Sequence, residues 1–276
     1  MFINTKHLVI TLIAVFIALG LGILIGFQLD SNQIILQQQQ ELIETLELTF
    51  DELTQTNHAL EAQIHTLQLR QEQDQAFIAA MAGDYLRQRL SGQNIVIVQT
   101  AIDHNYPELT QCLQLAGAQV VASISITDKT PLENETDSQV LNPEHPLPIL
   151  IADAISHNQT EGIINLFRQG LMEVGGTFAS PPDYVILAGG SNKATTRPEL
   201  LDMPLIRELK QRSIPVIGVE SSELEYSYID YYKKEWISTV DNVDTIMGQT
   251  SLVLVLTGQN GNYGIKASAN TLVPLK

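Results

Sequence analysis

The sequence predicts an α/β protein with an N-terminal transmembrane helix, a parallel coiled-coil stalk, and a small doubly wound domain built on a mostly parallel sheet. Three observations predict this architecture. Residues 8–29 carry no charge, residues 30–90 lack proline and are rich in Gln, Glu and Leu, and residues 92–276 alternate β-branched runs with helical patterns. Such alternation is typical of a parallel sheet covered by helices on both faces.

The composition limits the classes of partner. The chain has 276 residues, of which 44% are apolar, and its 15 Lys and Arg face 31 Asp and Glu, for a formal charge of −16. Such an acidic chain repels the phosphates of nucleic acids, so we expect no nucleic-acid partner. Cys112 is the one cysteine, which excludes an intrachain disulfide, a Cys-only zinc site and an iron–sulfur cluster.

The apolar run at residues 8–29 predicts a membrane-spanning helix. At about 1.5 Å per residue it crosses a hydrocarbon core of roughly 30 Å. A cleavable signal peptide is the rival interpretation, but the run exceeds the usual length and no small-x-small cleavage site follows it. Lys6 precedes the span and the next basic residue is Arg70, so we expect residues 1–7 in the cytoplasm and the rest outside it.

Small residues recur at every fourth position within the predicted span. They are Ala14, Ala18, Gly22 and Gly26. This spacing places them on one helix face, where they allow two helices to approach closely. Gly and Ala are also common in membrane helices generally, so the stripe supports self-association only together with the stalk that follows.

The stalk at residues 30–90 fits a continuous heptad repeat. The a positions are Leu36, Ile43, Phe50, Asn57, Ile64, Gln71, Ile78 and Tyr85. The d positions are Leu46, Leu53, Leu60, Leu67, Asp74 and Met81. Because both helices start from the same membrane face, the coiled coil must be parallel, and a polar Asn57 at a favours a dimer, with a trimer as the alternative. Gln71 and Asp74 weaken the seam near its end.

Five strands and five helices are expected in the domain at residues 92–276. The predicted strands are residues 94–100, 119–127, 184–190, 214–220 and 236–240. The predicted helices are residues 107–118, 149–157, 162–174, 203–212 and a helix that starts at Asp241 and ends at Gly258. An acidic loop, residues 128–148, separates the second strand from the next helix.

Ligands of such sheets bind outside the carboxyl ends of the strands. Here those ends carry the polar residues Asp103, His104, Asp128, Lys129, Gly189, Gly190, Ser191, Asn192, Glu220, Ser221 and Ser222. Polar residues are equally typical of plain loops, and the turn at 189–192 has neither the dinucleotide fingerprint nor a P-loop Lys. Because no nucleophile elbow or triad pattern is present, we expect a protein that is not an enzyme and has no catalytic residues.

Soft Cu(I) prefers Cys and Met ligands, whereas Cu(II) accepts imidazole. Cys112 lies in an amphipathic pattern that predicts core packing, and the methionines fall on helical apolar patterns. His58 and His65 are expected to be solvated stalk residues. The remaining candidates, His104, His145 and His157, are scattered. The sequence therefore assigns no cofactor-binding or metal-binding residue.

The segment "STVDNVDTIMGQTSLVLVL" raises the question of whether its carboxylates bind a metal or start a helix. Asp241 occupies an expected N-cap, Asn242 follows it, and Asp244 stands at the third helical position, as in a capping box. Carboxylates there also favour the positive end of the helix dipole. We expect a helix start, with Gly258 as the C-terminal cap.

Several motifs together resemble the MctB-type copper transport protein family of bacteria. They are the anchor "HLVITLIAVFIALGLGILIGFQL", the Gln/Leu stalk, "QLAGAQVVASISITDK", "YVILAGG", "SYIDYY", "STVDNVDTIMGQTSLVLVL" and "GNYGIKASANTLVP". The resemblance implies an envelope protein with one anchoring helix that contributes to copper efflux or homeostasis, and copper as a ligand. It also implies an outer-membrane pore, as proposed for mycobacterial members, and, from other relatives, a link to cell separation through an integral membrane partner.

Two functions are therefore expected. The first is envelope copper homeostasis, as the resemblance implies. The alternative is a non-enzymatic structural or regulatory scaffold, for cell separation or division, that acts through an integral membrane partner. In both, the chain contacts membrane lipid and pairs with a second copy of itself.

Overall fold

A computed structural model describes residues 5–130, 146–157, 160–178 and 181–274. The chain divides into two compact units, Met1–Gln73 and Asp74–Lys276, which are treated separately below. Most of the expected acidic loop and His145 lie outside the described residues.

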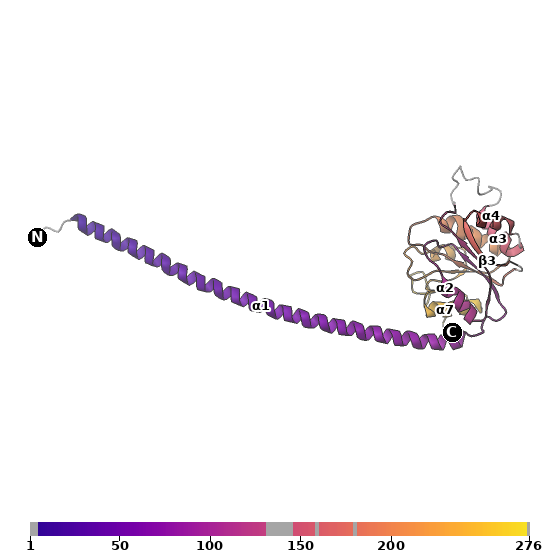
Figure 1. The fold of residues 1–276 in the computed structure, drawn as a ribbon, viewed down its shortest axis with the longest axis horizontal. Helices are drawn as coiled ribbons and strands as arrows, with labels where there is room; N and C mark the ends of the chain where they lie inside the picture. Colours follow the sequence, from indigo (N-terminus) through magenta and orange to yellow (C-terminus); the bar gives the residue numbers. More distant parts are fainter. Residues whose placement is uncertain (1–4, 131–145, 158–159, 179–180, 275–276) are drawn as a thin grey trace. The chain divides into compact units, whose positions relative to one another are not determined.

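Helix α1 (Thr5–Leu86) makes up the described part of the first unit as far as Gln73 (Figure 1). Its last turns, from Asp74 on, belong to the second unit. Within α1, Lys6–Phe27 is long and apolar enough to cross a membrane, which agrees with the predicted span to within two residues at each end. Its apolar side chains are exposed, as a lipid-facing helix requires. The coiled coil remains a prediction, because a pairing of helices requires a second chain.

The second unit is built on a seven-stranded sheet in the order β3-β2-β1-β4-β5-β6-β7. The strands are β1 (Asn94–Gln99), β2 (Gln119–Ile126), β3 (Met172–Gly176), β4 (Tyr184–Ala188), β5 (Val216–Val219), β6 (Ser238–Val240) and β7 (Asn262–Tyr263). All neighbours run parallel except β3, which pairs antiparallel with β2. The five predicted strands are confirmed, and β3 and β7 extend the sheet at its two edges.

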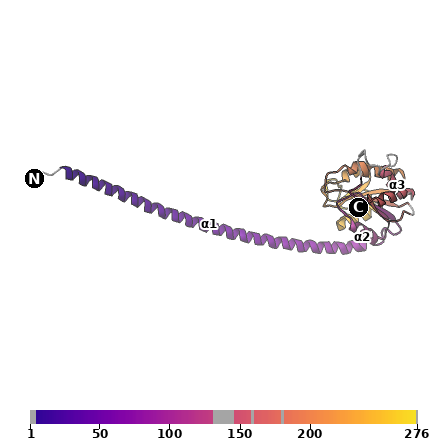
Figure 2. The same cartoon turned by 45° about the horizontal axis from the view of Figure 1, so that its top comes forward.

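Helices cover both faces of this sheet. The elements are α2 (Pro107–Leu115), α3 (Leu147–His157), α4 (Glu161–Arg168), the π-helical turn η1 (Pro198–Asp202), α5 (Met203–Gln211), α6 (Ile229–Lys234) and α7 (Ile246–Leu256). Buried residues of α2 and α7 form one apolar cluster with the sheet, and those of α3, α4, α5 and α6 form the other. Figures 1 and 2 show α2 and α3 on different sides of the sheet. The central strands β1, β4 and β5 read as nearly continuous apolar runs because both of their faces are buried.

The predicted helix at residues 162–174 is wrong in its second half. Helix α4 ends at Arg168, and Gly170 has a φ of +71°, a left-handed conformation that terminates a helix. The chain then turns back as β3, in which Met172 is fully buried and pairs with Ile126 of β2. The apolar pattern continues across Gly170 and therefore suits one helix, but this glycine marks the boundary between two elements.

Candidate functional site

Polar groups from the ends of the central strands meet at the carboxyl edge of the sheet. Asp103 follows β1, and its Oδ2 accepts hydrogen bonds from Asn192 N at 2.8 Å and Ser191 Oγ at 3.2 Å, both in the turn after β4. Tyr106 Oη donates to Gly189 O and accepts from Ser221 N at 3.3 Å. These contacts bring together the polar ends of β1, β4 and β5, as the parallel topology predicts.

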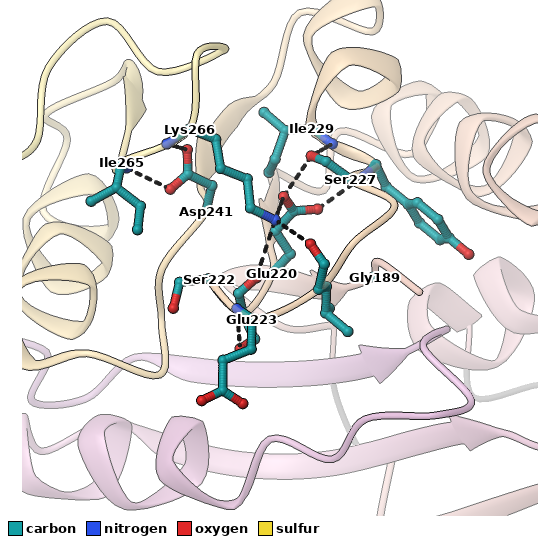
Figure 3. Close-up of polar contacts among 12 residues, drawn as sticks. Gly189, Glu220, Ser222, Glu223, Ser227, Ile229, Asp241, Ile265 and Lys266 are labelled. Carbon is teal, nitrogen blue, oxygen red and sulfur yellow. Dashed lines mark hydrogen bonds and ion pairs between the residues drawn. The ribbon is translucent and has the colours of Figure 1, made fainter. Parts of the chain in front are cut away.

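A buried ion pair lies at the end of β5. Lys266 Nζ donates to Glu220 Oε1 at 2.7 Å, with the Glu220 side chain 0% exposed and the Lys266 side chain 19% exposed. Glu220 Oε2 accepts from Tyr228 N at 2.9 Å, and Ser227 Oγ also donates to this carboxylate. Lys266 reaches it from the C-terminal segment, between Glu220 and Asp241 (Figure 3). The pair thus ties that segment to the end of β5.

Burial raises the pKa of the Glu220 carboxyl above its ordinary value. Removal from water disfavours the carboxylate, and the contacts with Lys266, Ser227 and Tyr228 N counteract only part of that effect. The ammonium group of Lys266 is fully used, because it also donates to Ser221 O and to Leu224 O, both at 3.2 Å. The ammonium group and the carboxylate therefore have their partners within the domain, and neither is left as an unpaired charge.

Asp241 is not the helix N-cap that the sequence predicts. It lies after β6, is buried, and accepts hydrogen bonds from the backbone N–H groups of Ile265 at 2.7 Å and Lys266 at 3.0 Å. Gly264 just before them has a φ of +141°, and a Cβ there would overlap the Asp241 carboxylate. Asp241 therefore anchors the C-terminal segment against the sheet, as Figure 3 shows.

The N-cap of α7 is Thr245, whose side chain accepts from Gly248 N at 3.1 Å. Asp244 is outside the helix and binds Ser222 through both carboxylate oxygens, with Ser222 N at 2.7 Å. The capping-box prediction is wrong because a turn at residues 242–245 separates β6 from the helix. The predicted C-terminal end is confirmed, since Gly258 follows the last turn with a φ of +101°.

Asn242, the third member of this predicted helix start, also stands outside α7. Its carbonyl oxygen accepts from Thr245 N at 2.9 Å and from Thr245 Oγ1 at 2.8 Å, which holds the turn. The side chain is buried, and its Oδ1 has no hydrogen-bond partner. A buried amide oxygen without a hydrogen-bond partner is uncommon in folded proteins.

Sequence reasoning missed a second buried group, centred on Asp202 at the end of η1. Asp202 Oδ2 accepts from Thr100 Oγ1 at 2.9 Å and from Tyr232 Oη, whereas Oδ1 has no partner. Complete burial raises the pKa of Asp202 to about 6, although both hydrogen bonds and the nearby Arg197 oppose the shift. Arg197 itself donates to Thr127 O at 3.0 Å, and burial lowers its pKa.

The described residues contain no cluster of three or more His, Cys, Asp or Glu side chains that could hold a metal ion. Burial raises the pKa of the Cys112 thiol to about 12, which suppresses the thiolate that metals bind. Exposed His58 contacts Glu61, and His104 packs edge-on against Tyr106. The core position predicted for Cys112 is confirmed, and these residues do not fit a resident copper site.

A profile of the protein family described as "Copper transport outer membrane protein, MctB" matches residues 2–141 and 140–274. Together the two matched regions cover nearly the whole chain, including the membrane-span candidate and the sheet domain. The resemblance inferred from the sequence motifs is therefore confirmed. A comparison with curated proteins gives no match.

Proposed function

Because the chain belongs to the MctB family of copper transport outer membrane proteins, we propose that it contributes to copper efflux and homeostasis in the cell envelope. The observation that carries this proposal is the family match, which extends over both units. One apolar N-terminal helix supports the association with a membrane.

In this proposal copper is the transported cargo and not a resident cofactor. The described residues offer no preassembled group of three His, Cys, Asp or Glu ligands, and the carboxylates at the strand ends are bound to backbone or side-chain donors of the same domain. Since Glu220 already has Lys266 as a counter-ion, a cation has little to gain there. The domain would therefore act by contacting another component of the export system, without performing chemistry.

The anchor sets the topology that we propose. Lys6 precedes the span, so the positive-inside rule places the N-terminus in the cytoplasm and the sheet domain outside it. A protease added to intact spheroplasts should then cleave the domain and leave an epitope placed before Lys6 protected.

A second copy of the chain is the proposed partner of α1. Its apolar a and d residues between Leu36 and Leu67 are between 51% and 69% exposed, which is costly for a helix that remains single in water. A parallel dimer buries this stripe. Leu60→Cys, at a d position, should form a disulfide-linked dimer, whereas Gln55→Cys, on the outer face, should not. Equal crosslinking at both positions would refute the proposed contact between the a and d residues of two α1 helices.

Copper sensitivity of a strain that lacks the gene tests the proposed function. We expect growth of the deletion strain to fail at a lower copper concentration than growth of its parent. The full-length chain should restore tolerance. An expression-matched Lys193→Met variant, altered at an exposed lysine, is the positive control and should restore it equally. Identical copper tolerance of parent and deletion strain would contradict the proposal.

A non-enzymatic scaffold that recruits an integral membrane protein is the second candidate function. It is favoured by the internally paired polar groups at the strand ends, which leave the domain better suited to contact than to catalysis. A photo-crosslinking residue at Gln55 on the outer face of α1 should trap one specific membrane protein. A deletion strain with normal copper tolerance and altered cell separation would favour this function over copper efflux.

A further inference from the structure

Trp236 is the most exposed large apolar residue that the structure describes in the second unit. It is the one tryptophan of the chain, it lies between α6 and β6, and it is 89% exposed. Tryptophan buries more surface than most side chains when it packs in a core, and here almost none of that surface is removed from water. The ring therefore contributes little to the stability of the fold.

The backbone at Trp236 is also strained. Its φ is +56°, in the left-handed region, and its N–H donates to Lys233 O at 3.0 Å, which closes the end of α6. Glycine is the usual residue at such a helix end, because a residue with a Cβ is strained in this conformation. Tryptophan is thus unfavourable for folding here through both exposure and strain. Such positions are concentrated where a residue serves a function.

Basic groups from two helices flank Trp236. The preceding residue, Glu235, is buried, and its carboxylate accepts a hydrogen bond from Arg207 Nε at 2.9 Å, while its backbone oxygen accepts from Lys210 Nζ at 2.6 Å. Arg207, Lys210 and Lys234 are all exposed. Three cations beside one buried, paired carboxylate give this surface a net positive charge, in a chain whose formal charge is −16. We call Arg207, Lys210, Lys234 and Trp236 the Trp236 patch.

The cations of the Trp236 patch have separate contacts. Arg207 and Lys210 bind Glu235, and Lys234 Nζ lies 4.9 Å from the centre of the Tyr231 ring. They therefore provide a positive potential spread around an exposed ring, and not a pocket for one anion. This combination suits a surface with many negative charges that can accept an indole between its groups. Tryptophan and basic residues are typical of the layer of lipid headgroups.

We propose that the Trp236 patch docks on a bilayer surface that contains anionic lipid. The indole ring inserts among the headgroups, which accommodate both its apolar body and its N–H donor, and the three cations face lipid phosphates. Because the rest of the chain is acidic, the same bilayer repels it, so charge complementarity selects the face that docks. This contact is additional to the apolar span of α1 and independent of the role in copper homeostasis.

The fluorescence of Trp236 tests the docking directly, because the chain has no other tryptophan. The full-length protein is held in phosphatidylcholine nanodiscs and mixed with vesicles of phosphatidylglycerol and phosphatidylcholine. We expect the emission to shift to shorter wavelength. Brominated phosphatidylglycerol, placed in the vesicles in one arm and in the nanodiscs in the other, should quench it in the bilayer that the ring enters. Neither shift nor quenching in both arms would overturn the proposal and direct the search to an acidic protein surface.

Variants separate the ring from the charges, with cosedimentation of the nanodisc-held protein and sucrose-loaded vesicles as the measurement. Trp236→Gly should lose most binding while its Tm stays equal or rises, because glycine tolerates a φ of +56°. Lys210→Gln and Lys234→Gln should each weaken binding about five-fold. Lys193→Gln, at an exposed lysine outside the patch, is the control and should bind like the wild type. Undiminished binding of Trp236→Gly, or equal binding to pure phosphatidylcholine vesicles, would contradict the proposal.

Discussion

Replacing Lys266 by Met tests whether the buried pair with Glu220 holds the C-terminal segment to the sheet. The substitution keeps the length of the side chain and removes the ammonium group. Glu220, with a fully buried side chain, then loses its counter-ion and keeps only Ser227 and Tyr228 N as donors. Removing one partner of a buried pair costs about 3–5 kcal/mol.

We expect the lower end of this range, about 3 kcal/mol, because Lys266 is partly exposed and two donors to Glu220 remain. For a domain of this size that corresponds to a fall of about 6–12 °C in Tm. The effect should depend on pH. A carboxyl whose folded pKa is raised binds more protons when folded, so stability falls as the pH rises towards that pKa. Without Lys266 the Glu220 pKa rises further, so the deficit should be smaller at pH 5 than at pH 8.

Near-UV circular dichroism of the full-length protein in detergent measures this change, because the buried Tyr228 and Tyr232 report on the domain and not on α1. Lys193→Met, at an exposed lysine outside the network, is the control and should leave Tm within about 1 °C. Glu220→Gln combined with Lys266→Met should recover part of the loss. A Lys266→Met variant as stable as the control would refute the claim that the pair anchors the segment.

Three further outcomes are expected. Asp241→Ala should lower the free energy of unfolding in urea by about 3 kcal/mol, because two backbone N–H donors lose a charged acceptor. Thr245→Ala, which removes the side-chain cap of α7, should lower it by about 1 kcal/mol. The reverse order of the two losses would restore the helix-cap interpretation of Asp241. Burial raises the pKa of Asp202 to about 6, so the wild-type domain should lose Tm between pH 4.5 and 7 as this carboxyl ionises. Asp202→Asn removes the ionisable group and should reduce that loss. A pH profile of Tm that is the same in both proteins would contradict this. Cys112 should react with a thiol reagent at pH 8 only after unfolding, since it is buried with a pKa of about 12.

Periodicity and apolar runs were sufficient for most of the fold. The candidate span within α1 and the strands β1, β4 and β5 are signalled by runs of apolar residues. Strand β2 shows an alternation of buried and less buried residues instead, and β6 is a short run that ends in β-branched residues. Strands β3 and β7 were missed for different reasons. The apolar start of β3 also suits a helix, and β7 has only two residues, too few for any periodicity.

The polar contacts could be predicted only in part. Residues that follow strands, such as Asp103 and Ser191, meet because parallel strands end at one edge. The partner of Glu220 could not be found this way, since Lys266 comes from an irregular segment after the last strand. The role of Asp241 was missed for the same reason, because its donors are backbone N–H groups of that segment, which carry no sequence signature.

The copper content of cells tests the central claim most directly. Elemental analysis would compare the parent, a strain that lacks the gene, and the same strain expressing the full-length chain, all grown at one sub-inhibitory copper concentration. We predict that the deletion strain retains more copper than the parent and that the full-length chain returns the content to the parental level. Equal copper content in all three strains would contradict a role in copper efflux.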